Sequence, residues 1–161
     1  MQNLVGDYCN PFLPDDNDRF NIWELLIRRD FEAFLRQDWE AVQGDYLSEE
    51  FHGIDFQKTP QSSSWKLGYP SLASYRTSWL SDSAKFNQTP LFFDPRKILY
   101  ACCRLEYWDL QADIGIVHKV FDGVFPVHGK NPIEMRWRSI FILRRSDAQW
   151  KIAGFVGYIP L

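Results

Sequence analysis

The 161-residue chain lacks the sequence features of membrane proteins, disulfide-rich secreted proteins and common metal-binding proteins. No apolar run approaches the length of a membrane-spanning helix, and the first residues show no charged segment followed by an apolar stretch. The three cysteines do not make a disulfide framework, and no HxH, HExxH or CxxC string is present. We therefore expect a cytoplasmic protein with no membrane partner, no bound metal and no cofactor.

The sequence also lacks a surplus of positive charge. Lysine and arginine number 18 against 21 aspartates and glutamates, which gives a net charge of -3. Nucleic-acid binding needs a basic surface that displaces counterions from phosphates, so we expect no nucleic-acid partner. The one basic stretch, within residues 136–145, is typical of the solvated face and end of a strand. No phosphate-binding glycine loop and no nucleophile elbow occurs, which disfavours nucleotide binding and triad hydrolysis.

Aromatic residues, by contrast, are plentiful at 17% of the chain, and hydrophobic residues make up 45%. Large rings bury much area each, so one domain of this length can form a stable core and keep rings to line a pocket. Residues 1–18 are rich in Pro, Asn and Asp and are interpreted as an N-terminal arm. Residues 19–161 are interpreted as one domain.

Helical periodicity dominates the first half of the domain. Apolar residues spaced by three and four predict a helix from Phe20 to about Gln37, with Asp18 as its N-cap. A shorter helix is expected from Trp39 to about Tyr46 and a third over residues 71–81. The polar segment 57–70 has the length typical of a lid or a disordered loop.

A period of two replaces the helical period after Pro95. One short strand is expected earlier, at residues 51–56. Four more strands are predicted at residues 97–109, 112–121, 134–145 and 149–158. Helices followed by hairpin-linked strands predict an α+β fold with an antiparallel sheet.

Two local strings carry a resemblance to a known family. They are RRDFEAFLRQDWEAVQGDYLSEEFHGID (residues 28–55) and WRSIFILRRSDAQWKIAGFVGYIP (residues 137–160). Together with the element order over residues 20–158, they resemble the nuclear transport factor 2-like superfamily, which includes SnoaL-like and ketosteroid-isomerase-like proteins. The resemblance implies N-terminal helices packed in a strongly curved sheet, forming a cone with an open pocket. It also implies a homodimer formed through the outer face of the sheet.

Asp55 and His118 are the candidate catalytic residues. Asp55 falls where ketosteroid-isomerase-like members carry a general-base aspartate, and a carboxylate in an apolar mouth can shuttle a proton. Its alternative role is a turn or capping bond at a strand end. His118 shares a strand face with isoleucines, and it is either a core histidine or a proton donor or acceptor inside the cone. Phe31, near the position of an isomerase tyrosine, has no hydroxyl and counts against ketosteroid isomerisation.

The expected ligand contacts are mainly aromatic: Trp65, Tyr75, Trp79 and Trp108. On the strand at 134–145, either Arg138 or Ser139 must face inward, because neighbouring side chains alternate between the two sides of a sheet. An inward Arg138 would bind an anionic ligand or pair with a carboxylate such as Asp55 or Glu106.

Three functions are compatible with these patterns. The first is binding of a small apolar or aromatic molecule in the cone, which is the preferred hypothesis because few polar groups converge there. The second is an acid–base lyase, isomerase or epoxide-opening enzyme with Asp55 as the base and His118 or a tyrosine as the acid, which needs Asp55 and His118 to face a common space. The third is a structural or interaction subunit that uses the outer face of the sheet.

Overall fold

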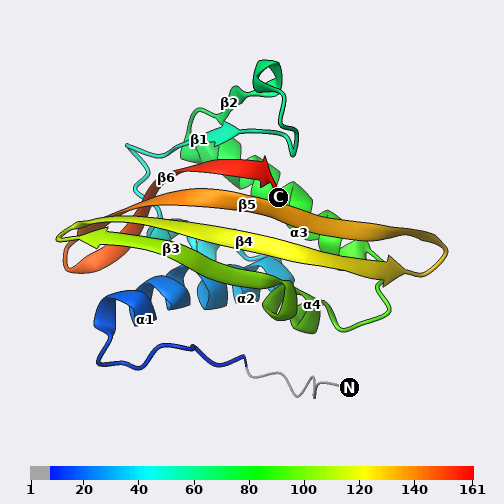
Figure 1. Ribbon diagram of the computed structural model, residues 1–161, viewed down its shortest axis with the longest axis horizontal. Coiled ribbons are helices and arrows are strands. Elements are labelled where there is room, and N and C mark those ends of the chain that lie inside the picture. Colours follow the sequence, from blue (N-terminus) through cyan, green and yellow to red (C-terminus); the bar gives the residue numbers. More distant parts are fainter. Residues whose placement is uncertain (1–7) are drawn as a thin grey trace.

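The computed structural model describes residues 8–161, in which helices pack on one side of a single six-stranded sheet (Figure 1). The elements are α1 (Asn17–Trp23), η1 (Glu24–Arg29), α2 (Asp30–Arg36), η2 (Trp39–Ala41), η3 (Gln43–Asp45), β1 (His52–Asp55), η4 (Ser62–Ser64), β2 (Lys66–Tyr69), α3 (Leu72–Gln88), α4 (Pro95–Cys102), β3 (Cys103–Gln111), β4 (Ile114–Val127), β5 (Lys130–Ser146) and β6 (Gln149–Pro160). This arrangement confirms the predicted α+β class.

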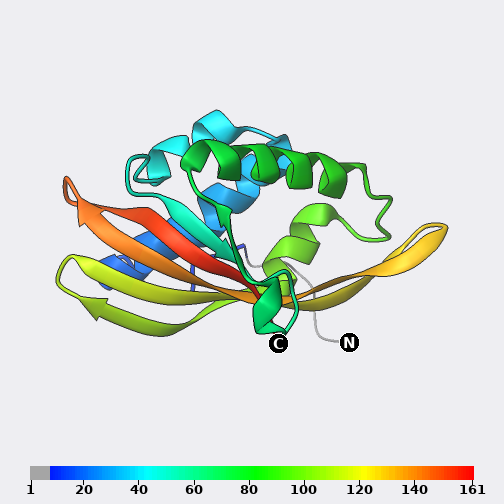
Figure 2. The same ribbon diagram turned by 90° about the horizontal axis from the view of Figure 1, so that it is seen from above.

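The sheet has the order β2-β1-β6-β5-β4-β3 and is open at both edges. Its neighbours are antiparallel except for β1 and β6, which pair in parallel, so the sheet is mixed and the purely antiparallel prediction is wrong at this pair. No hairpin links β1 to β6, because β1 follows the N-terminal helices and β6 is the last strand of the chain. Only strands joined by a hairpin are required to run antiparallel. The long β4–β5 hairpin extends beyond the helices at one end (Figure 2).

The predicted helix from Phe20 is one continuous helical segment with a π-helical turn, η1, between α1 and α2. It begins at Asn17. Asp18 is therefore not the N-cap, and its carboxylate instead accepts bonds from Trp150 and Arg145. The expected helix after Trp39 is two short 3-10 turns, η2 and η3, because Gly44 weakens helix propensity there.

Three predicted boundaries move in the second half of the domain. Helix α3 begins at a capping box on Ser71 and runs to Gln88, past the predicted end. Residues 95–102 are helix α4 and not strand, since Asp94 caps a helix that has Pro95 in its first turn. The stretch between the strands predicted at 112–121 and 134–145 is itself mostly strand, which extends the β4–β5 hairpin to a tip near Gly129.

The core lies between the helices and the inner face of the sheet. One cluster joins α1 and η1 to β4 and β5 through Ile22, Leu25, Val117 and Leu143. A second cluster joins α2 and α4 to the hairpin side, and it includes Ile27, Phe31, Ile98, Phe121 and Met135. The two clusters enclose the space in which the candidate site is found.

The described part of the N-terminal arm packs on the domain. The ring of Phe12 meets the ring of Trp108 edge-on, with centroids 5.1 Å apart. The Asn10 amide donates to Glu24 in η1 at 3.0 Å, whereas Leu13 stays 70% exposed. The arm assigned to residues 1–18 thus lies partly outside the described residues, because these begin at Tyr8.

Within residues 8–161, no helix combines the length and apolarity needed to cross a membrane.

Candidate functional site

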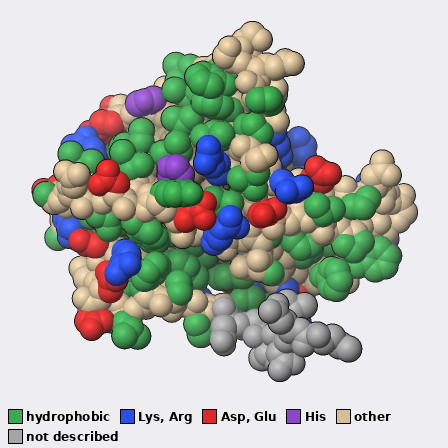
Figure 3. Space-filling model, viewed as in Figure 1, with side chains coloured by type: hydrophobic (Ala, Val, Ile, Leu, Met, Phe, Trp, Pro, Cys, Tyr) green, Lys and Arg blue, Asp and Glu red, His purple; other side chains and the backbone are tan. Residues whose placement is uncertain are grey.

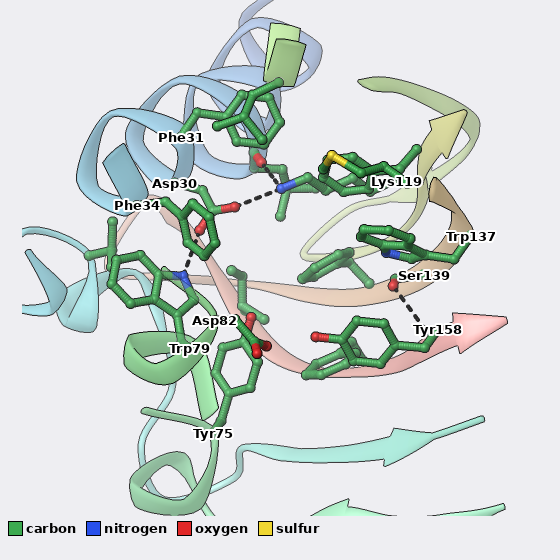
Figure 4. Close-up of a pocket in the computed structure, with 18 of the residues that line it drawn as sticks. Asp30, Phe31, Phe34, Tyr75, Trp79, Asp82, Lys119, Trp137, Ser139 and Tyr158 are labelled. Carbon is green, nitrogen blue, oxygen red and sulfur yellow. Dashed lines mark hydrogen bonds and ion pairs between the residues drawn. The ribbon is translucent and has the colours of Figure 1, made fainter. Parts of the chain in front are cut away.

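A cavity of about 300 Å³ lies between the inner face of the sheet and helices α2 and α3 (Figure 4). Its walls are mainly rings: Phe34 from α2, Trp79 from α3, Phe121 from β4, and Trp137 and Phe141 from β5. The rings come from the helices on one side and from the sheet on the other.

Lys119 places a charge inside this apolar space. It lies on β4 between the inward-facing Val117 and Phe121, and its side chain is 5% exposed. The ammonium donates to Asp30 Oδ2 at 2.7 Å and to the Leu26 carbonyl at 2.6 Å. A buried lysine needs such a partner, because an unpaired charge in an apolar interior costs several kcal/mol.

The acceptors of Lys119 come from the π-helical turn and the residue that follows it. Leu26 belongs to η1, where the backbone ladder departs from the α-helical pattern, and its carbonyl oxygen bonds to Lys119. Asp30 opens α2, and its second oxygen accepts from Trp79 Nε1 at 3.1 Å. Each carboxylate oxygen therefore holds one donor, and the carboxylate is fixed between α3 and β4.

Ser139 extends the polar floor across the sheet. It is the Cα partner of Lys119 on β5, so both side chains point into the cavity. Its hydroxyl accepts from the backbone N–H of Tyr158 at 3.4 Å, and the residue is 7% exposed. The sequence did not determine whether Arg138 or Ser139 faces inward. The structure shows that Ser139 does.

Three tyrosines, Tyr46, Tyr75 and Tyr158, also line the cavity. Burial raises the pKa of each phenol well above its usual value, and Asp30 adds to this effect at Tyr46 and Tyr75. The phenols therefore stay protonated and can donate hydrogen bonds at neutral pH.

The mouth of the cavity carries Lys58 and Asp82. The Lys58 ammonium lies 4.2 Å from the centroid of the Trp137 ring. The backbone that carries Lys58 has a φ of 56° at both Gln57 and Lys58. Non-glycine residues rarely adopt this left-handed conformation. Desolvation raises the pKa of the Asp82 carboxyl, while the charges of Lys85 and Lys58 oppose that rise. In Figure 4 the Asp82 carboxyl and the Tyr158 hydroxyl point toward the same space.

Of the residues expected to contact a ligand, Tyr75 and Trp79 line the cavity. The others do not. Trp65 is 49% exposed and its ring packs on Phe56 at 3.9 Å, within the polar segment 57–70 that also contains the unexpected strand β2. Trp108 packs on the N-terminal arm.

Arg138 lies on the outer side of the sheet, because it neighbours the inward Ser139 on β5. Its Nε is buried without a hydrogen-bond partner, so the predicted pairing with Asp55 or Glu106 through this atom does not form. Arg138 is instead close enough to His118 to lower the pKa of that imidazole, an effect second to desolvation.

Asp55 and His118 lie on opposite sides of the sheet. Asp55 pairs with Gly157 at the inner side of β6, and its Oδ1 accepts from the Gln57 N–H at 2.7 Å, which is a local turn bond. His118 neighbours the inward Lys119, so it faces outward, with its ring centroid 5.0 Å from that of Tyr107. The common space that the acid–base hypothesis requires does not exist between these two residues.

Sequence reasoning missed Asp30, Lys119 and Asp82. The available signal was a lysine at every-second-residue spacing between Val117 and Phe121, where only apolar side chains are expected on an inward face. Within residues 8–161, no three His, Cys, Asp or Glu side chains come together in a group that could hold a metal ion.

Neither a protein-family model nor a curated protein matches the sequence. Solved structures do match. A nuclear transport factor 2-like protein of unknown function from Shewanella oneidensis is 14% identical with a TM-score of 0.56, covering 90% of this chain and 98% of its own. One from Novosphingobium aromaticivorans, described as having a cystatin-like fold, is 16% identical with a TM-score of 0.52, covering 88% and 80%.

A third structure, from Streptomyces avermitilis, is described as a candidate dehydratase of the nuclear transport factor 2-like family. It is 13% identical with a TM-score of 0.54, and the match covers 92% of this chain and 99% of that one. Structural similarity at such low sequence identity supports a shared fold only. The chemistry of the cavity has to be argued from the residues of this chain. The chain has the nuclear transport factor 2-like, cystatin-like fold, as the sequence resemblance predicts.

Proposed function

We propose that this protein binds a small planar aromatic molecule that carries one polar group, inside the cavity between the sheet and α2 and α3. The observation that carries the proposal is a cavity of about 300 Å³ with aromatic walls and a buried polar floor formed by Lys119, Asp30 and Ser139. Ligand sites in proteins are typically apolar concavities in which a few fixed polar groups set the orientation of the guest.

The floor supports recognition of an oxygen atom on the guest. An ammonium has three N–H donors, and two of those of Lys119 are used by Asp30 and Leu26. The third donor and the hydroxyl of Ser139, on the neighbouring strand, are available to a phenol or carbonyl oxygen. A guest without such an oxygen would leave these groups desolvated and unpaired, which lowers affinity.

The proposal is tested by titrating the purified protein with 2-naphthol and with naphthalene while following tryptophan fluorescence. We expect saturable quenching by 2-naphthol, since Trp79 and Trp137 line the cavity, and weaker binding of naphthalene. Ser139→Phe fills the cavity and is expected to abolish binding. Ile142→Phe adds the same ring on the outer face and is the matched control. Equal binding by both variants would contradict the proposal.

A second candidate function concerns the outer face of the sheet. Tyr107, Ile114, Ile116 and Ile142 are 67%, 60%, 38% and 36% exposed there. Arginines and carboxylates alternate around them, among them Arg104, Glu106, Asp122 and Arg136 (Figure 3). Apolar side chains exposed together on one face are typical of a protein–protein contact, so we propose that this face pairs with a second copy of the chain as a homodimer.

A further inference from the structure

Lys119 supplies a primary amine to the inside of the cavity. Lys58 also lines the cavity, but it lies at the mouth and is exposed to solvent. The Lys119 Nζ lies 4.7 Å from the centroid of Phe31 and 5.5 Å from that of Phe121. Lysines that are desolvated among apolar groups are the ones that proteins use as amine nucleophiles toward carbonyl compounds.

We propose that Lys119 captures an aromatic aldehyde in the cavity as a covalent imine. This inference rests on the proposed function, because the aldehyde must first occupy the same space as the aromatic guest. It extends that function from reversible contact to a bond between the guest carbon and Nζ.

Asp30 is positioned to move the protons that the reaction requires. The ammonium of Lys119 passes one proton to the Asp30 carboxylate along their 2.7 Å hydrogen bond, which frees the nitrogen lone pair. The amine then adds to the aldehyde carbon, and a proton moves from nitrogen to the former carbonyl oxygen. Asp30 returns its proton to that hydroxyl, the C–O bond breaks, and water leaves. The iminium that remains carries one N–H and the original positive charge, opposite the regenerated carboxylate.

The surroundings favour the product over its hydrolysis. The iminium cation keeps the Asp30 counter-ion, and Trp79 holds that carboxylate in place through its other oxygen. Phenyl faces of Phe31 and Phe121 stabilise a cation at this position. The aromatic walls limit the access of water to the C=N bond.

The experiment treats the purified protein with 2-naphthaldehyde, reduces the mixture with sodium borohydride, and measures the intact mass. We expect a gain equal to one naphthylmethyl group per chain, and peptide mapping that places it on Lys119. Lys119→Arg retains the charge and the ion pair but cannot form the imine, so the gain should be lost. Lys130→Arg replaces an exposed lysine on β5 that does not line the cavity, and this matched control should label like the natural chain.

Peptide mapping of the natural chain decides the question even where Lys119→Arg folds poorly. Labels spread over exposed lysines, or retained in a folded Lys119→Arg variant, would overturn the imine. 2-Naphthalenemethanol, which has no carbonyl, is titrated in parallel by tryptophan fluorescence. Binding of the alcohol without trapping of the aldehyde would overturn the imine and leave the proposed binding function standing. If the alcohol does not bind and the aldehyde is not trapped, both the imine and the proposed binding function are overturned.

Discussion

At the scale of single residues, the pair formed by Lys119 and Asp30 is the feature that distinguishes this cavity from an ordinary apolar core. The pair joins three elements, since Lys119 comes from β4, Asp30 from α2, and Trp79 on α3 holds the carboxylate. Removing one member of a buried pair leaves the other charge without a partner, and the cost of that exceeds the net value of the pair itself.

Lys119→Met and Asp30→Asn are each expected to lower the free energy of unfolding by about 3–5 kcal/mol, while the double variant should lose less than the sum of the two. Urea denaturation of all four proteins measures the coupling. The exposed pair of Arg76 and Glu40 is the control, and Arg76→Met should cost at most about 1 kcal/mol. Additive losses in the buried pair would show that the two charges do not depend on each other.

Asp82 gives a pH-dependent prediction at the cavity mouth. Desolvation raises its pKa in the folded state above the ordinary value of 3.8, so the folded chain binds the proton more tightly than the unfolded chain. The stability that Asp82 contributes is then present below 3.8 and is lost as the pH rises through the folded-state pKa. Asp82→Asn should therefore be more stable than the natural chain near about pH 7, with the advantage vanishing near about pH 3. Urea denaturation across this range checks it, and a destabilised variant at neutral pH would contradict it.

The sequence predicted some of these residues and not others for a definite reason. Tyr75 and Trp79 follow a helical period, which predicts one apolar face, and that face does line the cavity. The alternation on β4 is ambiguous, because His118 lies between Ile116 and Val120 on one face while Lys119 lies between Val117 and Phe121 on the other. Which side of the strand turns inward depends on packing against the helices, and no local pattern specifies it.

At the scale of elements, the parallel contact with β6 holds β1 against the strand that supplies Ile152, Phe155 and Tyr158 to the cavity wall. Gly154 is essential to it, because a Cβ on this residue would lie 2.6 Å from the backbone oxygen of His52 on the paired strand. A backbone atom cannot move aside to make room for the Cβ, as the end of a flexible side chain could. Glycine inside a strand commonly marks such a close approach of another backbone.

Gly154→Ala is expected to destabilise the protein by about 1–3 kcal/mol, since the added methyl group forces β1 and β6 apart. Gly44→Ala is the matched control, because a Cβ there meets nothing within 4 Å and the change should stay within about 0.5 kcal/mol. Thermal and urea unfolding compare the two. Similar effects from both variants would contradict the role given to the strand contact.

Long elements with clear periods were predictable from sequence, whereas short and non-local ones were not. The long helical segment before Gln37 and the strands β4, β5 and β6 follow patterns that one stretch of sequence contains. Strand β2 has four residues in a polar segment, and the β1–β6 pairing joins residues that are far apart in the chain. The π-helical turn that presents the Leu26 carbonyl gives no periodic signal of its own.

At the scale of the whole molecule, the two faces of the sheet have different proposed functions. The inner face and the helices enclose the cavity, and the outer face carries the apolar and charged groups proposed to pair two copies. His118 and Arg138, expected at the ligand, belong to the outer face, where each has a buried nitrogen without a hydrogen-bond partner.

Ile116→Glu is expected to convert a dimer to a monomer without loss of 2-naphthol binding, because a buried carboxylate at the centre of the interface would have no partner. Light scattering coupled to size-exclusion chromatography measures the change. Phe93→Glu, at an exposed position outside the sheet, is the control and should leave the assembly unchanged. A natural chain that is monomeric would contradict the proposed interface.

Native mass spectrometry of the freshly purified protein shows whether the cavity holds a small molecule. We expect extra mass on the folded protein that is absent after denaturation, or that appears on addition of 2-naphthol and is lost in Ser139→Phe. A protein that carries no extra mass in either case, while the Ser139→Phe variant behaves identically, would contradict it.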